Sequence, residues 1–349
     1  MPFRGDRGDC GDWLKVLGPH LVEPLFQPPA VARLHSLASH LPGDCSGVFE
    51  LRLAPGPSIV DLSLRLLAPS QAPPLAERIS SPHLRDFLLR WSDPAGPFNR
   101  LHSVWLEFDL DREPQGLPLP VLCAKLQPGC EEDWVLGCLL PALHERPLSS
   151  AQRRWITLCL QEIPPPATLL YVFSLSPRGG DAVRLEIFGL DPAGILAYLE
   201  RIGPDLVPWV RDSAALFVGA ERIHLSLDIG AEILPRIGIE GSFSHLPRRE
   251  PRWRELFDRL VDSGLCAPEK GDAALAWPGS DSFWTAPERW PAKPRPAAGF
   301  CVRSLSHVKV VCRPDRDPEA KVYLMFGPLV RSGCTGAASS PASRSASAA

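Results

Sequence analysis

The sequence predicts an α+β protein, a ten-stranded antiparallel barrel of five hairpins ringed by helices. Three observations support this prediction. Five pairs of segments alternate charged and aliphatic residues with period two and are joined by short turns. The stretches between these pairs have helical periodicity. The charged residues gather on one face of the strands, and that face therefore cannot lie in a packed core.

The predicted strands are rich in β-branched and aromatic residues. The pairs are residues 48–53 with 59–66, 104–110 with 120–126, 169–175 with 183–190, 222–229 with 234–243, and 307–313 with 321–329. Helices are predicted over residues 29–41, 74–91, 150–161, 193–202, 204–216 and 250–264. In the last helix, Trp253, Leu256, Phe257, Leu260 and Val261 form one apolar stripe. We therefore expect one helix–helix–strand–strand unit repeated five times.

The polar face of the strands decides between two architectures. It comprises Arg52, Asp61, Arg65, Trp105, Glu107, Asp109, Lys125, Arg184, Glu186, Arg222, His224, Asp228, Arg236, Glu240, His307, Lys309, Arg313, Lys321 and Tyr323. Buried unpaired ions cost several kcal/mol each, so the opposite, aliphatic face must contact the helices. Closing ten strands removes the exposed edges and leaves a lumen wider than that of eight-stranded barrels. We favour a closed barrel with a polar lumen, and an open antiparallel sheet with helices on one face is the alternative.

Length and composition fit one large domain. The 349 residues are 45% hydrophobic, and the formal net charge of −3 argues against a general nucleic-acid-binding protein. The division we expect is a flexible segment 1–12, a barrel domain 13–331 and a disordered Ser/Ala/Gly-rich tail 332–349. No stretch approaches the roughly 18 apolar residues of a membrane span, and the N-terminus lacks a signal-peptide core. We expect a cytoplasmic monomer or dimer without membrane partners.

Motifs of common catalytic and metal sites are missing from the chain. The ten cysteines include no Cys-x-x-Cys pair, and Cys159 and Cys312 fit buried positions in a helix and a strand. The histidines show no metal-binding spacing, and no nucleophile elbow, Walker loop or dinucleotide fingerprint occurs. We therefore predict reduced thiols and no metal site.

Residues 278–299 carry Trp284, Trp290 and several prolines between the last predicted helix and the last hairpin. This stretch is too polar and too rich in proline to be a regular element. It is predicted to be either a lid over one mouth of the barrel or a loop pinned to the surface by its tryptophans.

The lysines give the sharpest local signal. The chain has 31 arginines and only six lysines, yet Lys125, Lys309 and Lys321 share the polar phase of three strands. Together with Arg52, Arg184 and the other strand arginines they predict a basic lumen suited to a phosphate-bearing or diphosphate-bearing ligand. The alternative is a network of cross-strand ion pairs that fixes the strand register.

This architecture resembles the aromatic prenyltransferases of the ABBA barrel type, which repeat α-β-β-α units around a ten-stranded barrel. The resemblance covers residues 20–330 in topology. The segment Lys321-Val322-Tyr323 is similar to the lysine-x-tyrosine strands of that lumen. Residues 22–25 (Val-Glu-Pro-Leu) and 43–46 (Gly-Asp-Cys-Ser) look like the opening of the cyanobactin-type peptide prenyltransferases, a branch of the same fold. The chain departs from the fungal members in having only three tyrosines.

The resemblance implies transfer of a prenyl group from an allylic diphosphate to an aromatic small molecule or to an aromatic or other nucleophilic peptide side chain. It implies Glu107 or Asp228 as the proton acceptor. The substrate-binding residues would be Arg52, Lys125, Arg184, His224, Arg236, Lys309, Lys321, Tyr323 and Trp105. Mg²⁺ can assist but is not required, because no Asp-Asp-x-x-Asp cluster occurs. The alternative function is a non-catalytic barrel that binds an anionic or peptide ligand, or a natural-product maturation partner.

Overall fold

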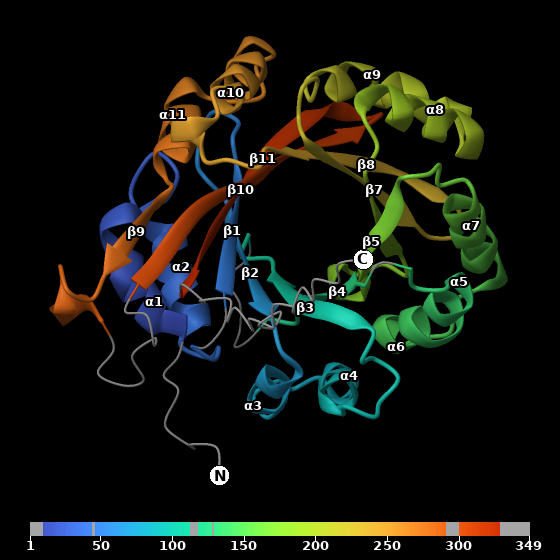
Figure 1. Ribbon diagram of the computed structural model, residues 1–349, viewed down its shortest axis with the longest axis horizontal. Helices are drawn as coiled ribbons and strands as arrows, with labels where there is room; N and C mark the ends of the chain where they lie inside the picture. Colours follow the sequence, from blue (N-terminus) through green and yellow to red (C-terminus); the bar gives the residue numbers. More distant parts are fainter. Residues whose placement is uncertain (1–9, 44–45, 112–117, 128, 291–299, 329–349) are drawn as a thin grey trace, which may run out of the picture.

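A computed structural model describes residues 10–43, 46–111, 118–127, 129–290 and 300–328. Ten strands form a closed antiparallel barrel, seen end-on in Figure 1 with the helices outside it. The strands of the barrel are β1 (Ser46–Arg52), β2 (Val60–Leu66), β3 (Leu101–Phe108), β4 (Val121–Leu126), β5 (Thr168–Ser174), β6 (Val183–Phe188), β7 (Arg222–Ile229), β8 (Ile233–Ser242), β10 (Phe300–Arg313) and β11 (Arg316–Pro328). The five predicted hairpins are all present.

The last strand closes the barrel onto the first. Tyr323 of β11 is the register partner of Glu50 in β1, and β11 pairs with β10, which pairs with β8. Each strand of the ring therefore has two neighbours. The closed barrel is confirmed, and the open sheet is wrong.

Helices precede each hairpin and pack on the outside of the barrel (Figure 1). They are α1 (Cys10–Leu17), α2 (Pro28–Ala38), α3 (Ala72–Ala76), α4 (Pro82–Ser92), α5 (Glu132–Trp134), α6 (Leu140–His144), α7 (Ser150–Gln161), α8 (Pro192–Ile202), α9 (Val207–Ala215), α10 (Arg252–Asp262) and α11 (Pro268–Ala276). A π-helical stretch, Val135–Leu139, joins α5 to α6. The repeat of helices followed by two strands is confirmed.

Helix α10 illustrates why these segments pack where they do. Four residues of its predicted stripe, Trp253, Leu256, Phe257 and Leu260, are buried, Val261 is partly buried, and the remaining positions carry charged residues. Fully burying a leucine or phenylalanine side chain contributes about 1.5–3 kcal/mol. The aliphatic faces of the strands join these helix stripes in one core, which leaves the polar strand faces to line the lumen.

Several boundaries differ from the predictions. The predicted helix 74–91 is two helices, α3 and α4, because α3 ends at Ala76 and Ser81 caps a new helix, α4, by accepting a hydrogen bond from the Leu84 backbone N–H. Helix α1 begins at Cys10, which is 1% exposed, so residues 10–12 of the segment 1–12 predicted to be flexible are helical, and residues 1–9 lie outside the described residues. Helix α11 and the stretch 132–144 were not predicted as helices.

The segment 278–299 contains a short strand that the sequence did not predict. Strand β9 (Gly279–Ser282) pairs with the start of β10 and lies outside the ring. Trp290 is 7% exposed and its ring contacts that of Trp13, 5.9 Å between centroids, whereas Trp284 is 76% exposed. No described residue of the segment lines the lumen. The described part therefore fits the pinned loop, with Trp290 as the anchor, and not a lid.

The described helices are all too short or too polar to cross a bilayer. The predicted tail 332–349 lies outside the described residues, as do residues 329–331 of the predicted domain.

Candidate functional site

The lumen holds a cavity of about 900 Å³. All eleven residues predicted for the site line it: Glu107, Asp228, Arg52, Lys125, Arg184, His224, Arg236, Lys309, Lys321, Tyr323 and Trp105. The inward direction of Lys125, Lys309 and Lys321 is confirmed. The period-two pattern accounts for this, because alternate residues of a strand point to opposite faces of the sheet.

Asp228 is held by two arginines. Arg184 donates hydrogen bonds of 2.6 and 3.1 Å to its two carboxylate oxygens, and Arg236 donates one of 3.2 Å. Burial by itself would raise the pKa of Asp228, but the guanidinium groups outweigh it and lower the pKa to about 2. Because such a carboxylate is a weak base, the arrangement suits a fixed ion pair better than the catalytic role predicted for Asp228.

Lys309 and Lys321 each contact a carboxylate. The Lys309 ammonium lies 2.5 Å from Glu240 Oε1 and 3.1 Å from Ser226 Oγ. Lys321 lies 2.6 Å from Glu50 Oε1, and the Tyr323 hydroxyl donates a 2.7 Å bond to the other Glu50 oxygen. Glu50 was missing from the predicted site, although it alternates with Val48 and Arg52 along β1 and therefore shares their face. Two of the three lysines predicted to hold diphosphate, Lys309 and Lys321, are thus already paired.

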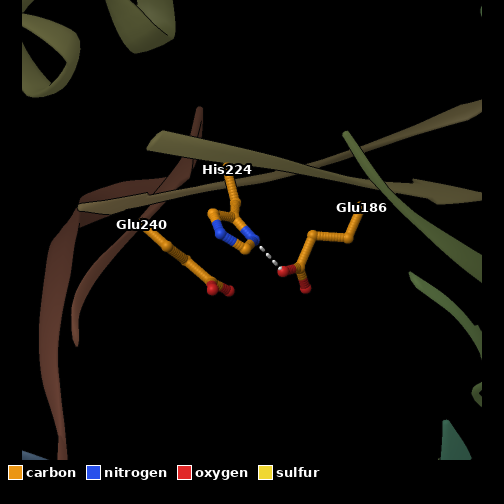
Figure 2. Close-up of side chains that lie close together, drawn as sticks. All are labelled: Glu186, His224 and Glu240. Carbon is orange, nitrogen blue, oxygen red and sulfur yellow. Dashed lines mark hydrogen bonds and ion pairs between the residues drawn. The ribbon is translucent and has the colours of Figure 1, made fainter. Parts of the chain in front are cut away.

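The lumen side of β6, β7 and β8 also contains a cluster of two carboxylates and an imidazole. Figure 2 shows His224 between Glu186 and Glu240, with its Nδ1–H donating a 2.6 Å bond to Glu186 Oε1. Each of the three residues offers one nitrogen or oxygen atom that could bind a metal ion, and these three atoms lie within 4.8 Å of one another. Mg²⁺ prefers all-oxygen ligands, and the Lys309 ammonium on Glu240 opposes a second cation at this point. We therefore treat the three side chains as a hydrogen-bonded cluster.

Glu107 lies on β3, apart from the ion pairs described above. Its side chain is 20% exposed and its one ion pair within the described residues is to Arg178, at 3.3 Å. Burial raises the pKa of Glu107, and the nearby Arg178 only partly offsets this. Arg178 comes from the β5–β6 turn and also donates two 2.8 Å bonds to Asp109. Turn residues were not assigned to either face, so Arg178 was missed.

Two cations beside aromatic rings have no carboxylate partner among the described residues: Lys125 lines the cavity, and Arg65 of β2 lies next to the cavity-lining Trp105. Within the described chain, neither Arg65 nor Lys125 forms an ion pair, and Arg65 Nε has no hydrogen-bond partner. Arg65 lies over the Trp105 ring, 5.3 Å from its centroid, and Lys125 lies 5.5 Å from the centroid of Tyr171. Burial lowers the pKa of both cations, and the charge of Arg65 lowers that of Lys125 further. We call Arg65 and Lys125 the cation pair. Arg222 and Arg313 also line the cavity without an ion pair among the described residues, but the cation pair is distinguished by its contacts with aromatic rings.

An apolar wall begins beside this cation pair. It consists of Trp105, Cys123, Tyr171, Phe173, Leu175, Ala182 and Leu234, all of which line the cavity. Cys123 and Phe173 are register partners on β4 and β5. The lumen is therefore two-sided, with ion pairs on β6 to β8, β10, β11 and β1 and an apolar wall on β3 to β6 and the start of β8.

No family model and no curated protein matches the chain. Several solved structures match the chain. AnaPT from Neosartorya fischeri superposes with a TM-score of 0.51 at 11% identity, over 82% of this chain and 80% of that chain. Prenyltransferase PriB superposes at 0.49 and 12% identity, over 90% and 94%. The 5-dimethylallyltryptophan synthase from Streptomyces coelicolor superposes at 0.44 and 14%, over 91% and 98%.

The likeness to AnaPT concerns the fold. The closed ten-stranded antiparallel barrel with surrounding helices matches the fold of the ABBA prenyltransferases. The comparisons do not assign the chain to the cyanobactin-type branch, which stays a prediction.

Proposed function

We propose that the lumen catalyses transfer of a prenyl group from an allylic diphosphate to an aromatic or other nucleophilic acceptor. The observation that carries this proposal is the cation pair Arg65 and Lys125, unpaired with any described carboxylate and placed beside Trp105 and Tyr171. A diphosphate would supply the missing negative charge. The rings would face the carbocation that forms when it leaves.

The reaction needs cations that bind the diphosphate, an acceptor with π electrons and a base that takes the acceptor's proton. The bond between the allylic carbon and the diphosphate oxygen breaks, and its electron pair leaves with the diphosphate. Preorganised Arg65 and Lys125 stabilise that growing charge more in the transition state than in the ground state. The π electrons of the acceptor form the new carbon bond, and its proton passes to a base. Glu107 suits this role because burial raises its pKa and the apolar wall adjoins it.

The remaining predicted binding residues take a different part in this proposal. Lys309, Lys321, Arg184 and Arg236 hold carboxylates and so fix the shape of the opposite wall. The acceptor would lie between that wall and the allylic carbon, where Glu50 and Glu186 offer hydrogen-bond acceptors. No metal is required for these steps, and Mg²⁺ would bind, if at all, with the diphosphate.

The extensive ion pairing favours a second candidate, a barrel that binds an anionic or peptide ligand without chemistry. Cross-strand pairs of this kind hold register whether or not a reaction occurs. The two candidates differ in turnover: only the first consumes an allylic diphosphate.

The test is mass spectrometry of the purified protein with dimethylallyl, geranyl and farnesyl diphosphate, each with a panel of indoles, phenols and peptides. We expect a product heavier than the acceptor by one prenyl group. Lys125→Ala and Arg65→Ala should each lower kcat by about two to three orders of magnitude. Arg78→Ala, at an exposed position outside the barrel, is the matched control. Binding without product in every combination would favour the ligand-binding barrel.

A further inference from the structure

The imidazole of His224, in the cluster shown in Figure 2, has no part in the steps proposed above. Glu186 Oε1 accepts the 2.6 Å hydrogen bond from His224 Nδ1–H. This bond fixes the orientation of the ring, and in the neutral imidazole it leaves the lone pair on Nε2. Because Glu186 is only 4% exposed, its charge acts on the imidazole in a medium of low dielectric constant. A carboxylate that orients an imidazole in this way prepares it to act as a base.

The second ring nitrogen of His224 is available to a ligand in the lumen. His224 lines the cavity, and within the described residues its Nε2 forms no hydrogen bond. Figure 2 shows this nitrogen on the side of the ring that faces Glu240. Burial by itself would raise the pKa of Glu240, but the charge of Lys309 outweighs it and lowers that pKa to about 2. Burial would lower the pKa of His224, but the hydrogen bond to Glu186 and the charge of Glu240 raise it. His224 is therefore a stronger base than Glu240.

Tyr171 places this imidazole beside the cation pair. Its ring centroid lies 5.5 Å from the Lys125 ammonium and 6.3 Å from the centroid of the His224 ring. The ammonium and the imidazole are therefore no more than about 12 Å apart, which matches a row of a phosphate oxygen, an allylic carbon and an attacking oxygen with about 3 Å between neighbours. The Phe188 ring lies edge-on to His224, with 5.1 Å between the centroids. An aromatic acceptor bound at His224 would contact both of these neighbouring rings.

The nucleophilic atom of the acceptor decides whether such a base is needed. When a ring carbon attacks, the proton leaves afterwards from a cationic intermediate, so a carboxylate such as Glu107 is a sufficient base. A phenol has a pKa of about 10, and its oxygen must lose the proton as it attacks. The most effective base for that step has a pKa near the operating pH. On the basis of the proposed function, we propose that Glu186 and His224 form a dyad that removes the proton of an acceptor hydroxyl, so that the lumen transfers the prenyl group to a phenolic oxygen.

The step balances without a further reactant. The hydroxyl proton passes to His224 Nε2, and an oxygen lone pair forms the bond to the allylic carbon. The bond between that carbon and the diphosphate oxygen breaks, and its electron pair leaves with the diphosphate. Glu186 and Glu240 stabilise the imidazolium that results, and its proton returns to water when the product leaves. His224 is thus the catalytic residue, and Glu186 is a positioning residue that acts through it.

The first test is the connectivity of the product from each of the three prenyl diphosphates with 4-methylphenol, which offers both a hydroxyl and free ring carbons. We expect an aryl ether, which nuclear magnetic resonance distinguishes from a ring-prenylated phenol. A product prenylated on ring carbon alone would overturn the inference. The comparison acceptor is 1-methylindole, whose nitrogen carries no proton and which therefore reacts through carbon.

Replacing the imidazole tests the base directly. His224→Gln should lower kcat for ether formation by about two to four orders of magnitude, the usual contribution of a general base. Transfer to the carbon of 1-methylindole should be unchanged. In His224→Ala, added free imidazole should restore part of the ether formation. His245→Gln, at an exposed position outside the lumen, is the matched control. Melts followed by circular dichroism show whether the variants are folded. Ether formation at the parental rate in folded His224 variants would contradict the dyad.

The pH profile tests the positioning role of Glu186. As a base His224 must be neutral, so kcat for ether formation should rise with pH through its pKa. Glu186→Gln keeps an acceptor for Nδ1–H but removes the charge that raises this pKa, so the acidic limb should move to lower pH. The other titratable or charged groups around the imidazole stay in place in this variant: Tyr171, Arg222, Glu240, His307 and Lys309. Glu200→Gln, at an exposed position of α8, should leave the limb unmoved. An unmoved limb in folded Glu186→Gln would contradict the positioning role. With 1-methylindole the limb should instead follow Glu107.

The product analysis separates this inference from the proposed function. If no combination of donor and acceptor gives a prenylated product, both proposals fail. If ring-carbon products alone form and His224→Gln turns over like the parent, prenyl transfer stands and only the dyad fails.

Discussion

At the scale of single residues, two lumen lysines, Lys309 and Lys321, stabilise the barrel by compensating buried carboxylates. Lys309 and Glu240 are 4% and 5% exposed, and their side chains are joined at 2.5 Å. Removing one member of such a pair leaves the other as an uncompensated buried charge, which costs about 3–5 kcal/mol. The wider cluster includes His307 Nε2, 3.4 Å from the second oxygen of Glu240.

We therefore predict that Lys309→Ala lowers the free energy of unfolding by about 3–5 kcal/mol in urea denaturation. The double variant Lys309→Ala/Glu240→Gln should recover much of this loss, because the glutamine carries no charge. Lys15→Ala removes an exposed pair with Asp12 and should cost no more than about 1 kcal/mol. Equal losses in the single and double variants would show that packing, not charge, is responsible.

The pH dependence of turnover should report Glu107. As a base it must be ionised, so kcat should rise as the pH increases through its pKa. Arg178 lowers that pKa against the larger effect of burial. Arg178→Ala should therefore move the acidic limb of the profile to higher pH, and Glu107→Gln should abolish the limb together with most of kcat. Arg146→Ala, which removes an exposed pair with Asp181, should leave the limb in place.

At the scale of elements, glycine lets a helix approach the barrel. Gly241 of β8 faces the Phe217 ring that follows α9, and a Cβ at this position would overlap that ring. Phe217 is fully buried. The contact therefore sets how closely α9 packs on the β7–β8 hairpin.

We predict that Gly241→Ala lowers the free energy of unfolding by about 1–3 kcal/mol, the usual cost of overpacking. Gly137→Ala is the control, because a Cβ there meets nothing within 4 Å. Thermal or urea denaturation of the two variants measures the difference. A Gly241→Ala protein as stable as the parent would mean that α9 shifts freely.

At the scale of the whole molecule, buried carboxylates make the barrel sensitive to acid. Asp228 and Glu240 have pKa values lowered to about 2, despite burial, by their cationic partners. In an unfolded chain these groups have pKa values of about 4. Their contribution is therefore fully present above pH 4 or so and is lost as the pH falls through about 2. Burial raises the pKa values of Asp61 and Glu107, so these two groups disfavour the folded state where they are ionised and disfavour it less as the pH falls and they become protonated.

Asp228→Asn isolates one of these contributions. It should destabilise the protein by about 3–5 kcal/mol near pH 7, because Arg184 and Arg236 lose their counter-charge. The difference in unfolding free energy between parent and variant should shrink as the pH falls from about 4 to 2. Urea titrations across that range provide the measurement. Asp212→Asn, at an exposed position of α9, should show no such trend. A constant Asp228→Asn difference across the range would contradict the lowered pKa.

The alternation of residues along the strands was enough to predict the hairpins, the helical face and the lumen face. Every residue chosen for the site lines the cavity because side-chain direction in a strand is a local property. Closure was also predictable in outline, since ten antiparallel strands with one charged face avoid exposed edges by joining the first strand to the last.

The tertiary structure alone decided which charges meet. Lys321 and Glu50 are 271 residues apart in sequence, and their contact depends on the register with which β11 closes onto β1. Arg178 reaches Asp109 and Glu107 from a turn, where no period-two rule applies. Lys309 and Lys321, two of the predicted diphosphate lysines, proved to be paired, while the third, Lys125, and Arg65 form no ion pair within the described residues. Composition specifies how many charges the lumen holds, but strand register and the depth of each residue in the barrel determine which of them stay free for a ligand.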